Sequence, residues 1–389
     1  MLGPPPTWQY ICIAYIPLLT GNLSVVGSSC IIYSLIGSGR WKTRSSKPQN
    51  RILLAMSIYD LFHSLPLAWT FLLFPKGYGL PGAQGNISTC RMLGFFIELG
   101  GCGTGACNAL LSIYYWLRIC KGVSPSKFAK YEGFAHFTIF SIFCGLATTG
   151  VAIKLFNPGI GTCFILSYPP GCETGPGTPP CDRFPRDTLG VYFQFFLQMW
   201  IQIYVITVTI THILIWRHVR KQDKSINRFL EEQTLEEAQT ARRSRSVAVQ
   251  STLYVCSFIS CWIGPIVLFI IGSILGFQSF WGVLVTNILT PLQGFWNAFV
   301  FARPTYSRIR EKYPEIGRFE VVKIVFFDPD FVMSSTPGQN NAMVDNAAAK
   351  MESGEDISDT HSQDSEGHGK EDDKSSENHD RTLLNTKNI

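Results

Sequence analysis

The chain has 389 residues and lacks the motifs that carry enzyme chemistry. It has no glycine-rich phosphate-binding loop, no His/Cys cluster with metal-ligand spacing, and no nucleophile accompanied by a general base. A row of glycines at Gly100, Gly101, Gly103 and Gly105 suits close packing of helices better than it suits catalysis. We therefore predict that the protein is not an enzyme and that it uses no metal ion and no cofactor.

Charged residues are scarce in seven long apolar segments within about the first 300 residues. About 20 apolar residues are needed to cross the core of a bilayer, and such a segment must be helical because no water is there to satisfy its backbone groups. The predicted spans are Tyr10–Ile36, Ile52–Phe74, Arg91–Leu117, Phe134–Phe156, Gly190–Trp216, Ala248–Leu275 and Phe280–Phe301. The sequence therefore predicts an all-α membrane protein, a seven-transmembrane helix bundle.

Positive charge is scarce on one side of these spans. The loops after spans one, three, five and seven contain most of the flanking Lys and Arg residues, whereas residues 1–9 contain none. Because positively charged loops stay in the cytosol, we predict an N-terminus outside and a C-terminus inside, at the plasma membrane. The positive charge near the spans is expected to meet anionic membrane lipid, and it gives no reason to expect nucleic acid binding.

Aromatic residues become rare towards the end of the chain. Residues 1–312 form the predicted membrane domain, with a short amphipathic helix after span seven, and residues 313–389 form a cytoplasmic tail. From about Ser334 the tail is rich in Ser, Asp, Glu, Asn and Gly, a composition that predicts disorder. Ser353 and Ser358 lie among acidic residues and are candidate phosphorylation sites, although a solvated tail with no fixed role fits equally well.

Four cysteines lie on the predicted outer side, where disulfides persist. They are Cys90, Cys163, Cys172 and Cys181, and four cysteines allow three pairings. Cys90 begins span three and Cys163 is the first cysteine of the following outer loop, which favours pairing these two and leaves Cys172 with Cys181. Asn86 begins an Asn-Ile-Ser sequence in a short outer loop and is a candidate glycosylation site.

Ionisable residues inside a span are costly, so each one is a candidate functional residue. Asp60 lies in the middle of span two with His63 one turn further along, and Glu98 lies in the outer half of span three. Each must face the interior of the bundle or water. Asp60 also fits a structural carboxylate that is hydrogen-bonded to neighbouring spans, whereas the depth of Glu98 favours a cavity open to the outside.

Span five contains a row of glutamines spaced by four residues, which places Gln194, Gln198 and Gln202 on one helical face. We expect this face to point into the bundle, where it either forms hydrogen bonds between helices or lines a ligand site. Pro265 removes a backbone hydrogen bond and is expected to kink span six. Other candidates in spans six and seven are Trp262, Asn287, Gln293 and Asn297.

Several of these segments resemble G-protein-coupled receptors, in particular the cyclic-AMP-receptor-like group of protists, over about residues 10–312. NRILLAMSIYDLF resembles the second-helix motif, with Asp60 at its acidic position, and Cys90 resembles the third-helix cysteine that bonds to the second outer loop. CWIGP resembles a displaced form of the sixth-helix aromatic–proline switch. PLQGFWNAFVFARPTYSRIR resembles the seventh helix and the amphipathic helix that follows it.

The sequence departs from the large rhodopsin-like class at two places. The triplet YYW, whose middle residue is Tyr115, replaces the acidic–Arg–aromatic triplet at the base of span three, with Arg118 nearby. Asn297 is followed by alanine where proline is usual. Both departures agree with the protist group, which commonly lacks these motifs.

The resemblance implies a receptor that senses a small extracellular ligand and activates a heterotrimeric G protein. The residues expected to bind the ligand are Glu98, Gln194, Gln198, Gln202, Trp262 and Gln293. The expected activation network is Asp60, His63, Asn297 and Pro265. The residues expected to contact the G protein are Tyr115, Arg118, Arg242, Arg243 and Arg245. Ser244 and Ser246 lie beside these arginines and are candidate phosphorylation sites, and kinases or arrestin-like proteins are further candidate partners at the tail.

Two other classes of seven-span protein are considered. A retinal protein needs a lysine in its last span, and span seven has none. A transporter usually shows internal repeats with broken helices at corresponding positions, and no repeat relates spans one to three to spans five to seven. The ligand stays open, because the resemblance favours a small polar molecule such as a cyclic nucleotide whereas Glu98 favours an amine or a neutral donor.

Overall fold

The computed structural model describes residues 7–37, 47–78, 80–159, 161–169, 172, 177–183, 188–228, 235–275 and 280–328. These residues all belong to one compact unit, Met1–Thr336. The predicted tail beyond residue 328, including Ser353 and Ser358, lies outside the described residues.

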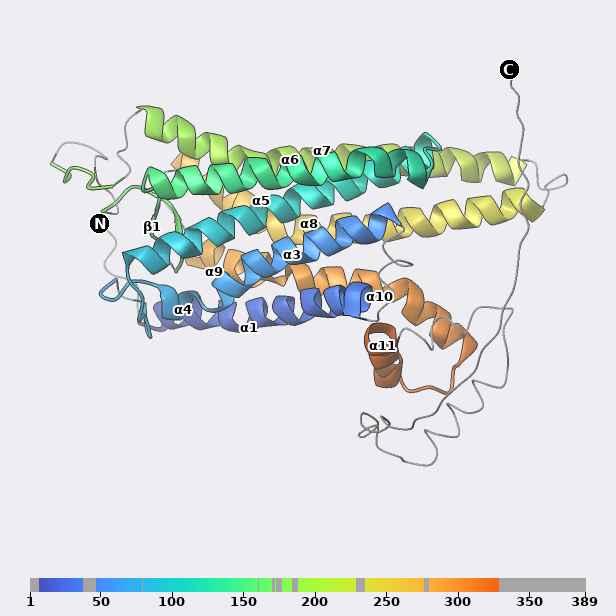
Figure 1. The fold of residues 1–389 in the computed structure, drawn as a ribbon, viewed down its shortest axis with the longest axis horizontal. Coiled ribbons are helices and arrows are strands. Elements are labelled where there is room, and N and C mark those ends of the chain that lie inside the picture. Colours follow the sequence, from blue (N-terminus) through green and yellow to red (C-terminus); the bar gives the residue numbers. More distant parts are fainter. Residues whose placement is uncertain are drawn as a thin grey trace, which may run out of the picture. The chain divides into compact units, whose positions relative to one another are not determined.

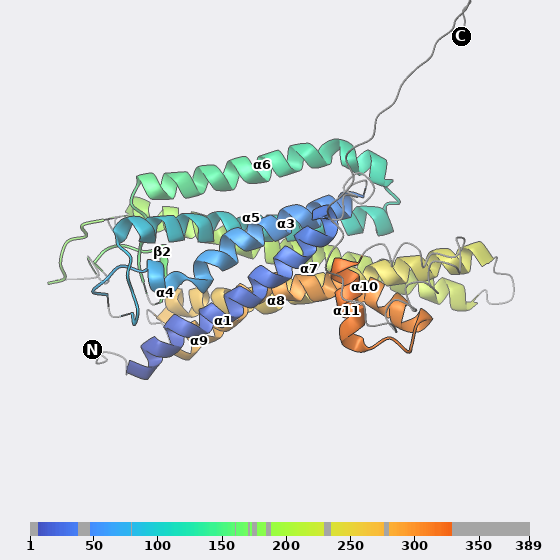
Figure 2. The ribbon, with the colours of Figure 1, turned by 60° about the horizontal axis from the view of Figure 1, so that its bottom comes forward.

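Helices form nearly all of this unit (Figure 1). The long ones are α1 (Thr7–Ile32), α3 (Pro48–Ala68), α5 (Ile87–Cys120), α6 (Pro125–Ala152), α7 (Thr188–Arg228), α8 (Leu235–Leu275) and α10 (Gln293–Lys312). Shorter helical segments are η1 (Tyr33–Gly37), α4 (Thr70–Leu73), α9 (Phe280–Leu289), η2 (Thr290–Leu292) and α11 (Arg318–Phe327). Strands β1 (Phe156–Pro158) and β2 (Cys163–Ile165) form an antiparallel hairpin. In the described part of the chain α1, α3, α5, α6, α7, α8 and the α9–α10 pair run side by side, which confirms the predicted seven-helix bundle (Figures 1 and 2).

Helix α5 is the central helix of the bundle. It packs against α3, α6, α7 and α8. It is also the most buried of the five described helices that are long and apolar enough to cross a membrane. A Cβ atom at Gly100 would collide with the backbone of α3 at His63, and one at Gly103 would collide with the ring of Tyr59. The interpretation of the glycine row as a packing surface is therefore confirmed.

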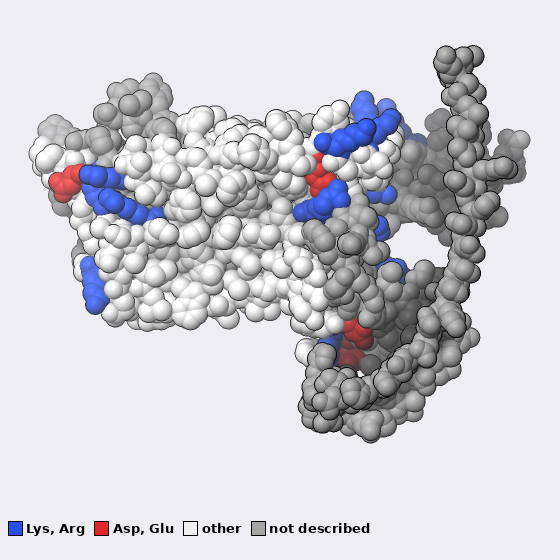
Figure 3. All heavy atoms as spheres, viewed as in Figure 1, with Lys and Arg blue, Asp and Glu red and all other residues white. Residues whose placement is uncertain are grey.

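The outer surface of the helices is apolar. In Figure 3 the Lys, Arg, Asp and Glu side chains of the described residues gather towards the two ends of the helices, and the band between them carries none on this face. Large apolar side chains such as Leu19, Val26, Phe134 and Phe137 are more than 60% exposed in the isolated chain. An apolar surface of this extent suits lipid rather than water, so the bundle is that of a multi-pass membrane protein.

Two helix ends and one interruption differ from the predicted spans. Helix α6 ends at Ala152, and Phe156 lies in strand β1 instead of span four. Helix α3 ends at Ala68, shortly after Pro66, and the last span is interrupted by η2 at Pro291. Proline removes a backbone donor and so interrupts helices. The predicted fourth span was too long because it included apolar residues of the outer hairpin. Hydropathy alone does not distinguish a buried strand from a helix.

The helix after the last span begins further along the chain than expected. Residues 302–312 continue α10 without a break, and α11 lies inside the segment 313–389 that the sequence assigns to the tail. Val321 and Ile324 of α11 are buried against Ile309 of α10. These apolar residues therefore pack α11 against α10, and the boundary of the tail at residue 313 stays a prediction.

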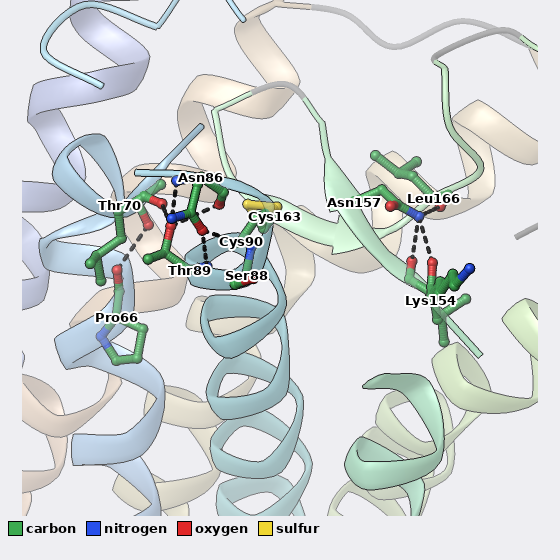
Figure 4. Close-up of a disulfide and its surroundings, with 12 residues drawn as sticks. Pro66, Thr70, Asn86, Ser88, Thr89, Cys90, Lys154, Asn157, Cys163 and Leu166 are labelled. Atoms are coloured by element: carbon green, nitrogen blue, oxygen red, sulfur yellow. Dashed lines mark hydrogen bonds between the residues drawn. A yellow bond between two sulfur atoms is a disulfide. The ribbon is translucent and has the colours of Figure 1, made fainter. Parts of the chain in front are cut away.

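Two disulfides hold the outer loops, and both predicted pairings are confirmed. Cys90 bonds to Cys163, and Cys172 bonds to Cys181. The first of these ties the first turn of α5 to strand β2 (Figure 4). In the same hairpin the Asn157 side-chain amide donates to the carbonyl oxygens of nearby residues, including Lys154 at 2.9 Å. The loop between α6 and α7 is thereby fixed to the end of the central helix.

Asn86 caps the outer end of α5 (Figure 4). Its Oδ1 accepts hydrogen bonds from the backbone N–H groups of Ser88 at 2.9 Å and Thr89 at 3.1 Å. The Thr89 hydroxyl oxygen accepts one from the backbone N–H of Asn86 at 2.8 Å, which completes a capping box. Asn86 is exposed, and its glycosylation stays a prediction.

Candidate functional site

A buried polar network crosses the centre of the bundle. Asp60 on α3 accepts a hydrogen bond from the Thr104 hydroxyl of α5 at 3.1 Å and one from the Asn297 amide of α10 at 3.0 Å. All three residues are buried. A lone carboxylate in apolar surroundings is costly, and two donors reduce that cost. The structure thus brings Asp60 and Asn297 together, two of the residues predicted to form one network.

A second buried group lies one turn along α3, nearer the outer end. Nδ1 of His63 lies 3.1 Å from the carbonyl oxygen of Ile97 on α5, and the His63 ring lies 5.7 Å from the Trp262 ring on α8. The Trp262 indole N–H donates to Oε1 of Gln293 on α10 at 2.7 Å. Gly101 permits this arrangement, because a Cβ atom there would come within 3.1 Å of both the His63 and the Trp262 side chains. These contacts connect α3, α5, α8 and α10.

Glu98 on α5 is closed off from water in this structure. Glu98 is 5% exposed, and the Cys102 thiol donates a hydrogen bond to Oε1 of Glu98 at 3.3 Å. The Tyr204 side chain of α7 also lies within electrostatic reach of the carboxylate. Among the described residues the expected cavity open to the outside is not seen at Glu98, whose neighbours are Cys102 of α5 and Tyr204 of α7.

Gln202 is the one member of the glutamine row of α7 whose side chain lies among the described residues. The side chains of Gln194 and Gln198 lie outside the described residues, and Gln202 is half-buried. The same spacing of four continues to Ile206, which is 57% exposed, whereas the buried face carries Tyr204. The inward orientation expected for the row stays a prediction, because two of its three side chains lie outside the described residues.

A polar cluster lies at the inner half of α5, between α7 and α8. It surrounds a cavity of about 10 Å³, measured as the space open to the centre of a water-sized sphere. One water needs about that much space. The buried hydroxyls of Tyr115, Ser251 and Tyr254 have no hydrogen-bond partner within the described chain. The lining residues are Asn108, Leu111, Ser112, Tyr115, Val208, Ser251, Tyr254 and Val255. The predicted coupling residue Tyr115 therefore faces α8 inside the bundle instead of an exposed surface.

Other predicted coupling residues lie at the inner ends of the helices. Arg118 donates to the hydroxyl oxygen of the neighbouring Tyr114 at 3.0 Å. Arg245 and Ser246 are exposed on α8, and the side chains of Arg242, Arg243 and Ser244 lie outside the described residues. Pro265 lies inside α8, which continues to Leu275.

Some residues of these networks have no signal in the sequence. Ser64 of α3 donates to Ser24 of α1 at 2.9 Å, and the same Ser24 oxygen accepts from the backbone N–H of Gly294 at 2.9 Å. Serine and threonine inside a span commonly bond back to their own helix, so their residue type alone does not reveal a partner. Glu132 of α6 is more conspicuous, because it is a carboxylate beside a span, and it accepts from Nε of Arg51 at 3.1 Å.

Comparisons with known proteins identify the fold. No family model matches the chain. The chain is 29% identical to a protein described as rhodopsin from Psalidodon fasciatus over 149 aligned residues. The aligned segment covers 38% of this chain and 39% of that protein. The chain thus matches about two fifths of the length of this curated relative. The crystal structure of squid rhodopsin matches with a TM-score of 0.61 and 15% identity, over 88% of this chain and 91% of that chain. The bundle therefore has the rhodopsin fold, and neither match confirms the narrower resemblance to the cyclic-AMP-receptor-like group.

Proposed function

We propose that this protein is a G-protein-coupled receptor, in which a small extracellular ligand rearranges the inner ends of α7 and α8 and thereby activates a heterotrimeric G protein. The observation that carries the proposal is the buried contact between His63, Trp262 and Gln293 within a rhodopsin fold. These side chains connect four helices at the outer end of the Asp60–Asn297 network. A ligand that binds one arrangement of such a network more tightly shifts the population towards it.

The ligand site of this proposal lies around Glu98, Trp262 and Gln293. All three side chains are buried, so ligand binding has to displace the contacts that close the site. A buried carboxylate favours a ligand with an amine or a neutral hydrogen-bond donor. Residues 280–311 contain no lysine, so the last span offers no amine for a Schiff base with retinal.

The coupling surface of the proposal lies at the inner ends of α7 and α8. Both helices continue past the predicted spans, α7 to Arg228 and α8 from Leu235. The cavity beside Tyr115 lies between α5, α7 and α8, and its lining residues lose some packing contacts to the empty space. The arginines Arg242, Arg243 and Arg245 also favour this topology through anionic lipid, at about 1 kcal/mol each.

The test is to measure two activities on the same purified protein. Reconstitution with a heterotrimeric G protein is expected to give ligand-dependent guanine-nucleotide exchange, whereas liposomes containing the protein alone are expected to show no solute flux. A cell membrane extract or a panel of small amines supplies candidate ligands. Flux without exchange would overturn the receptor proposal and support a seven-span solute transporter.

The arginine cluster provides a variant for the same assay. Replacing Arg242, Arg243 and Arg245 together by glutamine is expected to leave the topology intact in loop-accessibility labelling and to abolish nucleotide exchange. Replacing Arg308 and Arg310, which follow the last span on α10, by glutamine gives a control with neutralised charge at the same end. Normal exchange in the triple variant would leave its arginines as topological anchors only.

A further inference from the structure

Two arginines at the outer end of the bundle are held by the two disulfides. Arg91 follows Cys90 on the first turns of α5. Arg183 follows the Cys172–Cys181 disulfide by two residues. The backbone of Arg183 is also paired with Tyr168, with N–H to carbonyl distances of 3.0 and 3.2 Å in the two directions. The covalent and backbone constraints therefore fix the backbone from which both arginine side chains extend.

The two arginines lie close to a pair of tyrosine hydroxyls. The hydroxyl oxygens of Tyr78 and Tyr168 are 2.7 Å apart, and their ring centroids are 5.9 Å apart. Burial and the neighbouring positive charge of Arg91 lower the pKa of the Arg183 guanidinium, while the two tyrosines act in the opposite direction. Arg183 thus lies within electrostatic reach of Arg91 and of both tyrosines, although these side chains come from separate loops or helices.

This cluster has N–H donors but no negatively charged acceptor among the described residues. Nε of Arg91 and both Nε and Nη2 of Arg183 are buried and have no hydrogen-bond partner in the described chain. None of the carboxylates among the described residues lies within 4.0 Å of either guanidinium group, and the adjacent Asp182 side chain is exposed. Both residues are only partly buried, and two neighbouring like charges without a counter-ion repel each other unless an anion neutralises them.

We propose that Arg91 and Arg183, with the hydroxyls of Tyr78 and Tyr168, form a binding site for a small oxyanion on the outer face of the bundle. Guanidinium groups present rigid forks of N–H donors that match carboxylate, sulfate and phosphate oxygens. The ligand is either a free inorganic oxyanion or the anionic group of an organic molecule. Binding at this site goes beyond receptor activity, because it does not require the protein to couple to a G protein.

The site lies apart from the proposed ligand site around Glu98. Arg91 and Glu98 are separated by seven residues on α5, which corresponds to two helical turns or about 10 Å along the axis. The positive charges of Arg91 and Arg183 attract anions, whereas the carboxylate of Glu98 attracts cations or hydrogen-bond donors. The oxyanion site is therefore tested directly by binding, without any signalling readout.

The experiment uses the full chain, purified in detergent with its disulfides intact. Its melting temperature is followed during titration with inorganic phosphate or phenyl phosphate, with chloride replaced so that ionic strength stays constant. We expect both to stabilise the protein saturably. Equal affinities indicate a site for the free ion, and tighter binding of phenyl phosphate indicates a site for an organic anion. The absence of a saturable shift with either compound overturns the proposal.

Variants locate the binding. Arg183→Gln and Arg91→Gln are each expected to raise the half-saturating phosphate concentration at least tenfold, and to leave the melting temperature without phosphate unchanged or higher. Lys76→Gln removes an exposed positive charge at the same end and is expected to behave like the unaltered chain. Arg183→Lys keeps the charge but loses the fork, so it is expected to show an intermediate loss. An equal loss in Lys76→Gln would show that only general charge attraction is involved and would also overturn the proposal.

Discussion

The outer and inner halves of α5 are stabilised in different ways. The outer half is bonded covalently to the β hairpin through Cys90–Cys163, and its glycines bring it against α3. The inner half ends beside a small cavity lined by Tyr115 and Tyr254, whose hydroxyls have no partner in the described chain. The disulfide holds the outer end in one arrangement, although Nε of Arg91 there also has no partner in the described chain, whereas the unpartnered hydroxyls at the inner end leave alternatives close in free energy. The comparison indicates that the outer end is a fixed frame and the inner end the adaptable one.

The strongest test removes the covalent tie at the outer end. Cys90→Ser opens a loop of 73 residues and is expected to lower the free energy of unfolding by about 4 kcal/mol, whereas Cys181→Ser opens a loop of 9 residues and is expected to cost about 2.6 kcal/mol. Both values come from the loop entropy lost by the unfolded chain. Unfolding in mixed micelles measures the difference. A free Cys90 thiol in peptide maps of membrane-extracted protein would contradict this account of the outer end.

The second test removes the carboxylate in the middle of the bundle. Asp60→Ala leaves the Thr104 hydroxyl and the Asn297 amide without their acceptor, and we expect a loss of about 3 kcal/mol in the free energy of unfolding. Asp60→Asn keeps one acceptor and is expected to lose less. Thermal unfolding of the two purified variants compares them. If Asp60→Ala unfolds like the unaltered protein, the network does not hold the helices together.

The third test addresses the inner end. Tyr115→Phe removes a hydroxyl that has no protein partner in the described chain, so the change in unfolding free energy is expected to stay below about 1 kcal/mol. Tyr114→Phe is the matched control, because its hydroxyl accepts a hydrogen bond from Arg118. Thermal unfolding of the purified variants measures both changes. A loss in Tyr115→Phe as large as that of Asp60→Ala would remove the contrast between the two halves of α5.

The smallest effect on stability is expected at Glu98. Glu98→Gln keeps the shape of a buried side chain and removes its charge, so folding and surface level are expected to change little. Response to an activating ligand is expected to fall about tenfold, the equivalent of one lost hydrogen bond of about 1.4 kcal/mol. Gln202→Ala, which changes a partly buried side chain of α7, serves as the variant for comparison. Equal potency of Glu98→Gln and the unaltered protein, at matched surface levels, would return Glu98 to a structural role.

Some parts of the site are predictable from the sequence, and others are not. Asp60 and His63 stand out because ionisable residues are rare in spans, and the structure places both in the interior. The orientation of the glutamine row of α7 stays a prediction, because its spacing shows which residues share a face but not which face is buried. Thr104 and Tyr254 carry no signal at all, since their residue types are ordinary in membrane helices. Their part in the two clusters depends on which helix lies opposite.

The sequence by itself determined the properties that depend on neighbouring residues along the chain. Long apolar runs require helices in a membrane, and the outer cysteines at Cys90 and Cys163 limit the possible disulfides. Only the tertiary structure decided which polar groups meet, as for Asp60 and Asn297, which are 237 residues apart. It also decided that Arg91 and Arg183 lie together without a counter-ion in the described chain. The physical reason is that helix formation follows local hydrophobicity, whereas hydrogen bonds and charge interactions act over a few ångströms between segments whose positions are set by packing.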